Sequence, residues 1–347
     1  MRALEEDFAG RVVAWQRRHG RRHLPWQDQR DPYRVWLSEI MLQQTQVATV
    51  LDYYPRFLQR FPDVAALAAA SLDEVLGLWS GLGYYSRARN LHRCAVEVVT
   101  RFGGRFPDSA EQLQSLPGIG RSTAAAIAAF CFGERAAILD GNVKRVLSRT
   151  LGYGADLSVA AHERSLWGLA EELLPRARLE EAMPSYTQGL MDLGATVCQA
   201  RSPDCAACPV TELCEARREG RPEAYPVKTR KLRRSSESLW LLWASDRAGS
   251  VWLEQRPTPG VWAGLYCLPL FDSRAALEAA LPEGQQAALE DLEGFKHVLT
   301  HKDLHLHPVR VRLGSRALAG RPGAWFTAEQ WPALGLPAPV RRLLLPD

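Results

Sequence analysis

The sequence predicts a multidomain chain in which an all-α domain is followed by a smaller α+β domain. Residues 31–216 show the spacing of apolar residues that is typical of helices, and they contain no clear strand. Residues 237–347 instead contain alternating, strand-like segments. The stretch 217–236 between them is highly charged and poor in apolar residues, which is typical of a linker. We therefore expect a helical domain at 1–216, a basic linker at 217–236 and an α+β domain at 237–347.

The helical domain is predicted from local start and stop signals. Asp31 and Pro32 form a helix start, because an N-cap carboxylate accepts hydrogen bonds from the first turn and proline suits the first helical position. Further starts are indicated at Pro62, Ser71, Pro107 and Ser158, and breaks at Gly77, Gly83, Gly103, Gly104 and Gly152. This spacing predicts roughly ten helices joined by short connections.

The C-terminal domain is predicted from strand patterns. Residues 238–244 and 251–256 flank a polar turn, which indicates a β-hairpin. Residues 309–313 alternate like a half-exposed strand. Residues 273–281 and 329–334 are expected to be helical.

Composition bounds the class of protein. With 347 residues, 46% of them hydrophobic and 24% charged, the chain has the composition of a globular protein with room for two cores. It has no apolar run long enough to span a membrane and no export signal at its start, so we expect a cytoplasmic protein. The net charge is +4, and residues 217–234 hold eight basic and two acidic residues, so the remainder is near −2. A nucleic-acid-binding surface would therefore be a local patch, and a solvated linker explains the basic run equally well.

Four cysteines, Cys198, Cys205, Cys208 and Cys214, lie within seventeen residues of one another. Four thiolates this close together can surround one metal centre, and both zinc and an iron–sulfur cluster accept such a set. Only one pair has the short spacing that zinc sites usually repeat. Disulfides are disfavoured because nothing else indicates export to an oxidising compartment.

The segment from Leu116 to Thr123 reads Leu-Pro-Gly-Ile-Gly-Arg-Ser-Thr and lies between two predicted helices. Gly118 and Gly120 permit a tight turn, after which the next helix presents free backbone N–H groups. Such a helix start binds anions, including DNA phosphates. A plain corner between helices is the alternative.

Two carboxylates are candidates for acid–base chemistry. Asp140 follows an apolar run and precedes a predicted helix, where it is either an N-cap alone or a cap that also faces a developing positive charge. Glu39 lies on a predicted helix with Val35, Trp36 and Leu42 at neighbouring positions. In that setting its pKa would be raised and it would donate a proton near neutral pH, unless it points to solvent. The uncharged Gln43–Gln46 run that follows favours contact with bases.

Aromatic residues follow a glycine-rich segment at residues 81–85. Tyr84 and Tyr85 come after Gly81 and Gly83 and before Arg87. Aromatic side chains beside cations suit unstacked nucleic acid, and buried loop tyrosines are the alternative.

These segments together closely resemble adenine DNA glycosylases of the MutY type, in the helix-hairpin-helix glycosylase superfamily. The resemblance extends over nearly the whole chain and includes residues 24–26, 38–46, 81–85, 116–120, 138–143 and 191–195, as well as the cysteine loop. It implies one 4Fe–4S cluster at Cys198, Cys205, Cys208 and Cys214. It also implies a DNA-repair enzyme, a monomer, that flips adenine out of a duplex in which it pairs with 8-oxoguanine or guanine, and that works on the nucleoid.

The resemblance also assigns roles to individual residues. Catalysis would depend on Glu39 as the proton donor and Asp140 as the stabiliser or nucleophile, assisted by Asn142. The adenine pocket would comprise Trp26, Gln27, Leu42 and Gln188. DNA contacts would come from Gln44, Tyr84, Leu116, Gly118, Gly120, Ser122, Thr123 and Lys144, and the 8-oxoguanine would be recognised by Gln44, Tyr84, Thr300 and His301.

One sequence position distinguishes two branches of the superfamily. Endonuclease III, the runner-up, carries a lysine nucleophile after the hairpin glycines, where this chain has Ser122. A lysine forms a Schiff base and cuts the strand, whereas a serine does not. Lys144, the nearest substitute, lies elsewhere in the sequence. A glycosylase without lyase activity is therefore expected, and a non-catalytic DNA binder is disfavoured by the two carboxylates.

The C-terminal domain resembles the Nudix fold at residues 253–257 and 260–269. The glutamate-rich helix that would bind metal and cleave a diphosphate is missing from 273–283, so a recognition role is expected instead. Leu299 departs from the phenylalanine that several relatives carry there. Four histidines, His297, His301, His305 and His307, are explained by strand alternation rather than by a metal site.

Overall fold

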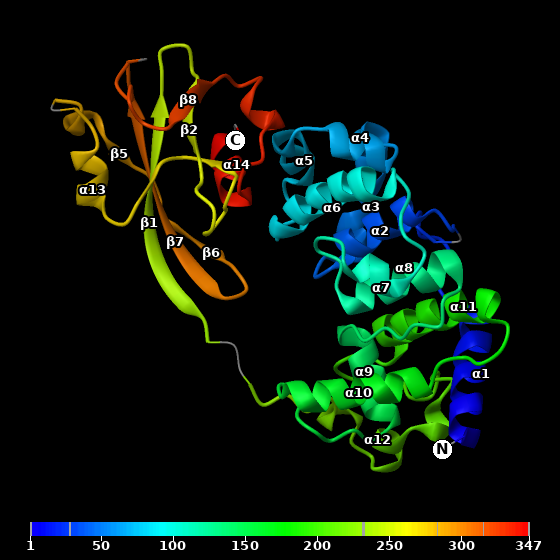
Figure 1. The fold of residues 1–347 in the computed structure, drawn as a ribbon. Coiled ribbons are helices and arrows are strands. Elements are labelled where there is room, and N and C mark those ends of the chain that lie inside the picture. Colours follow the sequence, from blue (N-terminus) through cyan, green and yellow to red (C-terminus); the bar gives the residue numbers. More distant parts are fainter. Residues whose placement is uncertain (1, 28, 231–232, 283, 315, 346–347) are drawn as a thin grey trace. The chain divides into compact units, whose positions relative to one another are not determined.

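The computed structural model describes residues 2–27, 29–230, 233–282, 284–314 and 316–345, and it divides into two compact units (Figure 1). One unit comprises residues 1–68 and 93–231, and the other comprises 69–92 and 232–347. Residues 217–231 thus belong to the helical unit, and 69–92 belong with the C-terminal residues, neither of which the predicted boundaries include. Lys231 and Leu232 of the predicted linker lie outside the described residues.

The first unit is helical, and its described residues contain no strand. A core of buried side chains from α1, α8, α9, α10 and α11 fills its centre. The contact between α1 and α11 is close, because a Cβ added at Gly189 would lie 2.8 Å from Val12 Cγ1. Its helices are α1 (Arg2–His19), α2 (Pro32–Leu42), α3 (Val47–Arg60), α4 (Val64–Ala69), α7 (Ala110–Gln114), α8 (Arg121–Phe132), α9 (Gly141–Thr150), α10 (Ala160–Glu172), α11 (Leu179–Asp192) and α12 (Glu215–Arg218), with α4 ending at the unit boundary.

Most helix starts follow the predicted signals. Asp31 Oδ1 accepts a hydrogen bond from Tyr33 N at 3.0 Å, and Ser71 Oγ accepts one from Glu74 N at 3.2 Å. These bonds satisfy amides that have no partner within the helix. The prediction of a break at Gly77 is wrong, because Gly77 lies inside α5 (Leu72–Trp79). The reason is packing: a Cβ there would lie 2.1 Å from the carbonyl oxygen of Ala333, so glycine permits close approach rather than a turn.

The second unit is built on one eight-stranded sheet, in which five strands follow the order β3-β2-β1-β7-β5 and β4, β6 and β8 pair with β1, β7 and β2. The predicted hairpin is confirmed, since β1 pairs antiparallel with β2 across Ser245 and Val251. On its other side β1 runs parallel to β7, with Leu239 opposite Leu306. The strands are β1 (Ser235–Ser245), β2 (Val251–Gln255), β3 (Tyr266–Cys267), β4 (Leu270–Phe271), β5 (Glu290–Asp291), β6 (Phe295–Val298), β7 (Lys302–Arg312) and β8 (Gly323–Phe326).

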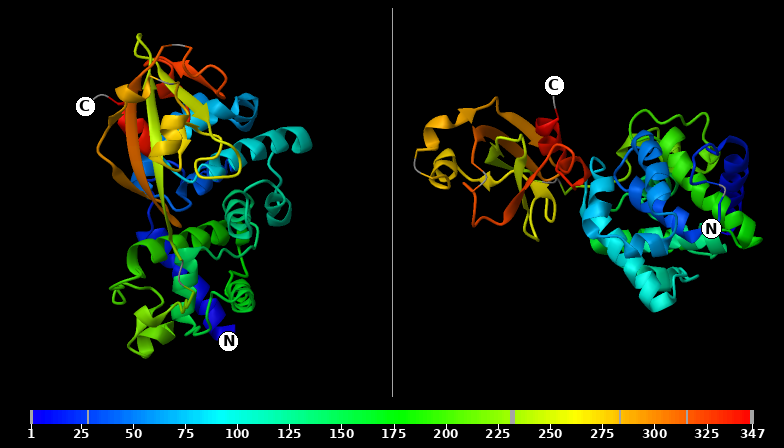
Figure 2. Two further views of the ribbon diagram at one scale, coloured as in Figure 1. Left: turned by 90° about the vertical axis from the view of Figure 1, so that its left-hand side faces the viewer. Right: turned by 90° about the horizontal axis from the view of Figure 1, so that it is seen from above.

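Helices flank this sheet and connect residues that are distant in sequence. The short helices α13 (Arg274–Ala279) and α14 (Ala338–Leu344) lie on opposite sides of it (Figures 1 and 2). Leu277 of α13 packs in one core with Leu242 and Val309. Residues 69–92, which include α5 and the first turns of α6 (Ser86–Phe102), complete the unit. None of the described helices has the length and apolar character of a membrane-crossing segment.

Candidate active site

Glu39 and Asp140 line the same cavity in the helical unit. The cavity has a volume of about 1090 Å³, and its walls come from α2, α8, the start of α9, and α11. Glu39 is in the last two turns of α2, while Asp140 immediately precedes α9, a hundred residues later. The fold therefore brings together the two carboxylates that the sequence suggested.

The Glu39 side chain is held among buried neighbours. Val35, Trp36, Leu37, Ser38 and Ile40 are all buried, whereas Glu39 lines the cavity. Burial, with a further contribution from the nearby charge of Asp140, raises the pKa of Glu39 to about 8. Both causes act in the same direction, because each disfavours the ionised form. Glu39 can therefore hold a proton at neutral pH and donate it.

Asp140 is an N-cap and a cavity residue at once. Its Oδ1 accepts a hydrogen bond from Val143 N at 2.8 Å, which is the cap expected from the sequence. Among the described residues, none donates a hydrogen bond to its Oδ2. The cap thus fixes the carboxylate while leaving one oxygen for a ligand in the cavity.

Asn142 is fixed by contacts with Arg145 and Gly194. Its Oδ1 accepts a hydrogen bond from Arg145 Nη2 at 2.9 Å. The same guanidinium donates to the carbonyl oxygen of Gly194 at 2.6 Å and to that of Cys198 at 2.7 Å. Gly194 lies so close that a Cβ there would be 2.6 Å from Asn142 Cβ. Asn142 is thus held at the cavity wall beside Asp140.

The four residues expected to bind adenine all line this cavity. Trp26 is buried and packs edge-on against Tyr54, with ring centroids 5.4 Å apart. Gln27 accepts a hydrogen bond from Leu24 N at 3.3 Å, and its buried Nε2 has no partner. Leu42 ends α2, and Gln188 projects from α11. An apolar wall with a few convergent polar groups is typical of a small-ligand pocket.

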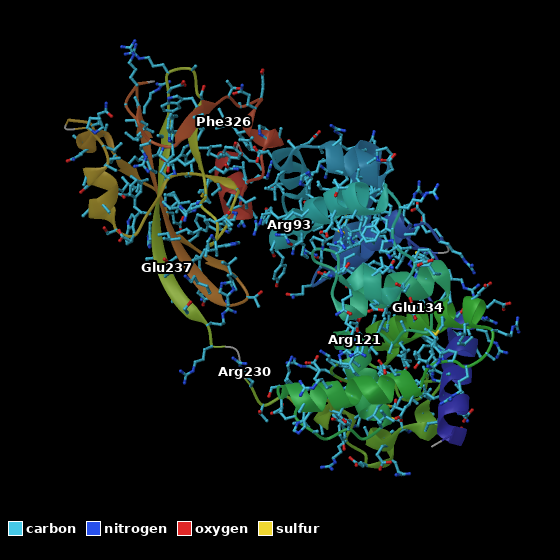
Figure 3. All side chains as sticks on the ribbon, viewed as in Figure 1. Arg93, Arg121, Glu134, Arg230, Glu237 and Phe326 are labelled. Atoms are coloured by element: carbon cyan, nitrogen blue, oxygen red, sulfur yellow. The ribbon has the colours of Figure 1, made fainter. Side chains whose placement is uncertain are left out.

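The turn predicted at residues 116–123 joins α7 to α8. Gly118 has a φ of 77°, and Gly120 caps α8 without a side-chain hydrogen bond, so the first amides of α8 stay available. Arg121, labelled in Figure 3, is the first residue of α8. Leu116 is buried and anchors the turn.

Side chains at the start of α8 bind other parts of the site. Thr123 Oγ1 accepts a hydrogen bond from Gln43 Nε2 at 3.3 Å, and Ser122 Oγ accepts one from Leu139 N at 3.1 Å. Both therefore help to fix the segments that carry the carboxylates. Lys144 forms an ion pair with Glu163 and does not line the cavity.

The two residues predicted to contact both DNA and 8-oxoguanine share an unusual backbone conformation. Gln44, in the helical unit, has a φ of 56°, and Tyr84, in the other unit, has a φ of 46°. Both side chains are exposed. Left-handed conformations are uncommon for residues other than glycine and concentrate at functional sites.

The predicted 8-oxoguanine contacts lie in the second unit. Thr300 and His301 are exposed in the turn between β6 and β7. The hydroxyl groups of Tyr84 and Thr300 are hydrogen-bonded at 2.6 Å. Residues 216 positions apart in sequence thus form one polar pair.

The four cysteines line a small cavity beneath α9 and α12. Arg149, which is buried, donates to Cys198 Sγ at 3.3 Å and to the carbonyl oxygens of Gln199 and Ala200 at 2.6 and 3.0 Å. Across the part of the chain that the structure describes, no three His, Cys, Asp or Glu side chains are grouped to hold a single ion. The four thiols share one cavity.

Sequence reasoning missed several residues of the site. Arg21, Arg22 and Arg30 reach the cavity from the segment after α1. Asp192 is 1% exposed and pairs with Arg21 at 2.8 Å. Asp192 stands four positions after Gln188 on α11, and this helical spacing was a signal for their contact.

Comparisons with known proteins match both halves of the chain. Residues 37–172 match the HhH-GPD superfamily of base excision DNA repair proteins, and residues 239–345 match the NUDIX domain. The chain is 35% identical over 342 residues to an adenine DNA glycosylase of Buchnera aphidicola subsp. Acyrthosiphon pisum (strain APS), with 97% of this chain and 96% of that protein covered.

Two further comparisons each cover about three fifths of the chain. Over 219 residues the chain is 48% identical to the adenine DNA glycosylase of Homo sapiens, covering 60% of this chain and 39% of the human protein. A solved structure of a thermostable thymine-DNA glycosylase superposes with a TM-score of 0.55 at 28% identity, covering 63% of this chain and 98% of that one.

Proposed function

Because the chain belongs to the adenine DNA glycosylase family, we propose that it removes adenine paired with 8-oxoguanine or guanine in duplex DNA. The reaction class, hydrolysis of an N-glycosyl bond in base excision repair, follows from the family. The observation that carries the proposal is the cavity in which Glu39, with a pKa raised to about 8, faces Asp140. One carboxyl held neutral and one carboxylate beside it is the pair that glycoside hydrolysis requires.

The reaction begins with adenine outside the stack, since its glycosidic bond cannot be reached inside a duplex. Protonated Glu39 donates to an imidazole-ring nitrogen of adenine, which makes the base a better leaving group. The bond breaks toward an oxocarbenium-like sugar, and the free Oδ2 of Asp140 faces that cation as a stabiliser or transient nucleophile. Glu39, now ionised, takes a proton from the attacking water. Asn142 assists Asp140. The hydrogen bond from Arg145 keeps the Asn142 side chain beside that carboxylate.

Adenine binds between the apolar and the amide side chains of the cavity. Trp26 and Leu42 supply flat and aliphatic surface, and Gln27 and Gln188 supply hydrogen-bonding groups. The unpartnered Nε2 of Gln27 supports this assignment, because a buried donor without a partner is costly until a ligand satisfies it.

DNA contacts the turn between α7 and α8 and two exposed side chains. The uncapped amides at the start of α8, beside Gly118 and Gly120, bind a phosphate. Gln44 and Tyr84 enter the duplex, a role that suits exposed residues fixed in a left-handed conformation.

The second unit recognises 8-oxoguanine through Thr300 and His301, with Gln44 and Tyr84 as the other contacts. The hydrogen bond between Tyr84 and Thr300 supports a shared task for these two residues. The short α13 has a single acid, Glu278, which pairs with Arg274, so diphosphate cleavage is not proposed for this unit.

One 4Fe–4S cluster is proposed for the cysteine cavity. The donor set of four thiols in one cavity fits an iron–sulfur cluster, which four cysteine thiolates hold. Cys198, Cys205, Cys208 and Cys214 would hold it, and bound there it would fold the loop over α9. We assign it a structural role, because four protein thiolates leave no position for a substrate. The exposed Arg201 in this loop suits contact with phosphate. Monomeric state and nucleoid association in the cytoplasm stay predictions.

Excision assays test the proposal directly. Duplexes with adenine opposite 8-oxoguanine, guanine or thymine are incubated with the full chain and then cleaved with alkali at abasic sites. We expect cleavage of the first two and little of the third. Borohydride should trap no covalent complex, because Ser122 forms no Schiff base and Lys144 is occupied by Glu163. A trapped complex would favour a lyase on oxidised pyrimidines, and no excision of adenine would overturn the proposal.

A further inference from the structure

Two glutamine side chains in the cavity have amide groups whose sense is fixed by their neighbours. The amide of a glutamine has a donating and an accepting end, and only its partners decide which end faces a ligand. Both Gln27 and Gln188 line the cavity. Each makes one side-chain hydrogen bond, and its partner group can either only donate or only accept.

Gln188 is fixed by Asp192. Its Nε2 donates to Asp192 Oδ1 at 2.8 Å, and the carboxylate can only accept. Arg21 holds that carboxylate with two more donors, its Nε on Oδ1 at 2.8 Å and its backbone N on Oδ2 at 2.9 Å. Asp192 is 1% exposed and is therefore shielded from bulk solvent. Gln188 must therefore direct Oε1, the accepting end, away from Asp192.

Gln27 is fixed in the opposite sense. Its Oε1 accepts a hydrogen bond from Leu24 N at 3.3 Å, and a backbone N–H can only donate. Its Nε2 is therefore the group that remains, and it is buried without a partner. The cavity thus has one amide that presents an acceptor and another that presents a donor.

We infer that Asp192 is a positioning residue that makes the site specific for a 6-amino purine by fixing the sense of the Gln188 amide. This inference rests on the proposed function. The exocyclic amino group of adenine donates to Gln188 Oε1, while a ring nitrogen of the base accepts from Gln27 Nε2. A 6-oxo purine such as hypoxanthine offers an oxygen to the Gln188 oxygen, and two acceptors cannot bond. Sites built in this way reject the wrong group strongly, because a buried polar atom stays unpaired.

The substitution Asp192→Asn tests this inference with little change in shape. Asparagine has one donating and one accepting end, so it no longer forces Gln188 to donate. Single-turnover excision is measured for adenine, purine and hypoxanthine, each opposite 8-oxoguanine. We expect adenine excision to fall about 10- to 100-fold, the effect of one mispaired buried hydrogen bond. Purine has no 6-substituent, so its excision should change little, and the preference for adenine over hypoxanthine should shrink.

A second substitution separates this role from a general loss of structure. Gln188→Glu in the Asp192→Asn background restores an acceptor, since a carboxylate accepts at both oxygens, and should restore adenine excision. Gln27→Met removes the donor and should lower adenine and purine excision alike. Glu172→Gln, an exposed acid on α10 outside the cavity, is the matched loss of one charge and should change neither rate.

The outcomes distinguish the inference from the proposed function. An equal loss on adenine, purine and hypoxanthine in Asp192→Asn, or no rescue by Gln188→Glu, would overturn the inference. A wild-type chain that excises adenine, with an Asp192→Asn variant of unchanged base preference, would also overturn it and leave the proposed function standing. A wild-type chain that excises no adenine from any duplex would instead overturn the proposed function.

Discussion

Glu39 and Asp140 face the same cavity, and the charge of Asp140 adds to burial in raising the pKa of Glu39 to about 8. The pair is unequal in environment. Glu39 has no hydrogen bond from another described side chain, whereas Asp140 is held by the first turn of α9. This difference supports the proposal that Glu39 is the proton donor and Asp140 the anion, and it leads to the first three predictions.

Replacing Glu39 with glutamine should abolish adenine release while preserving DNA binding. Glutamine keeps the shape of the side chain but cannot transfer a proton. We therefore expect the single-turnover rate to fall about 100- to 10,000-fold. Binding to a duplex with a non-cleavable adenine analogue, measured by fluorescence anisotropy, is the control. Excision at the wild-type rate would disprove the assignment.

Adenine excision should decline as the pH rises through about 8, because only protonated Glu39 donates. Asp140→Glu preserves the neighbouring negative charge, whereas Asp140→Asn removes it and should lower the pKa of Glu39. The residual activity of Asp140→Asn should therefore begin to decline at a lower pH than that of the wild type. Burial remains the larger cause, so the shift should be only partial. Identical pH profiles in the two variants would contradict the electrostatic coupling.

The same raised pKa predicts a stability difference with a definite sign. Between the unfolded pKa of about 4.5 and the folded value of about 8, the native state binds more protons than the unfolded state. The contribution of Glu39 to stability is therefore full below about 4.5 and is lost as the pH rises through 8.

Glu39→Gln should remove the loss of stability that the wild type shows as the pH rises. Urea unfolding should show the variant and the wild type equal at acidic pH. At pH above 8 the variant should be more stable, by on the order of 1–3 kcal/mol once screening through the open cavity is allowed for. A variant that is less stable at high pH would indicate that the carboxylate has a stabilising partner.

Arg149 is expected to determine whether the cysteine loop holds the proposed 4Fe–4S cluster. Arg149→Met leaves the carbonyl oxygens of Gln199, Ala200 and Tyr225 without their buried donor, at a cost of about 1–3 kcal/mol for each. We expect lower iron and sulfide content per chain and faster loss of the cluster to a chelator. Arg164→Met, an exposed arginine on α10, is the matched control. Full iron content and unchanged stability in Arg149→Met would refute this role.

Recognition of 8-oxoguanine is best tested by point substitution rather than by truncation. Deleting residues 237–347 would also uncover α5, on which Gly335 packs so closely that a Cβ there would lie 2.8 Å from Leu76 Cβ. Thr300→Val removes the hydroxyl that bonds Tyr84 and keeps the shape. The ratio of excision rates opposite 8-oxoguanine and guanine should fall about 5- to 10-fold, the effect of one hydrogen bond. His305→Val, at an exposed position on β7, is the control; an unchanged ratio in Thr300→Val would argue against recognition by this residue.

How much could be predicted from the sequence depended on the range of the interaction. The cap at Asp31, the hairpin at β1 and β2, and the cap at Asp140 depend on neighbouring residues, and all are present in the structure. The family resemblance supplied the pairing of Glu39 with Asp140, which no local pattern contains. The attachment of 69–92 to the C-terminal residues was missed, because it depends on contacts between residues distant in sequence. One example is the carbonyl oxygen of Leu336, which accepts hydrogen bonds from Ser80 and Tyr85 at 3.0 and 2.9 Å.

A pair of helical glycines tests whether this attachment contributes to stability. In Gly77→Ala the new Cβ would meet the Ala333 carbonyl oxygen at 2.1 Å, so α5 must move away from the C-terminal segment, at a cost of about 1–3 kcal/mol. In Gly168→Ala on α10 nothing lies within 4 Å, and alanine should instead stabilise the helix by about 0.5–1 kcal/mol. Thermal and urea unfolding should therefore shift in opposite directions for the same chemical change. Since Tyr84 and Thr300 belong to the unit that α5 completes, Gly77→Ala should also weaken the preference for 8-oxoguanine. Equal stabilisation by both substitutions would show that 69–92 does not depend on contact with the C-terminal residues.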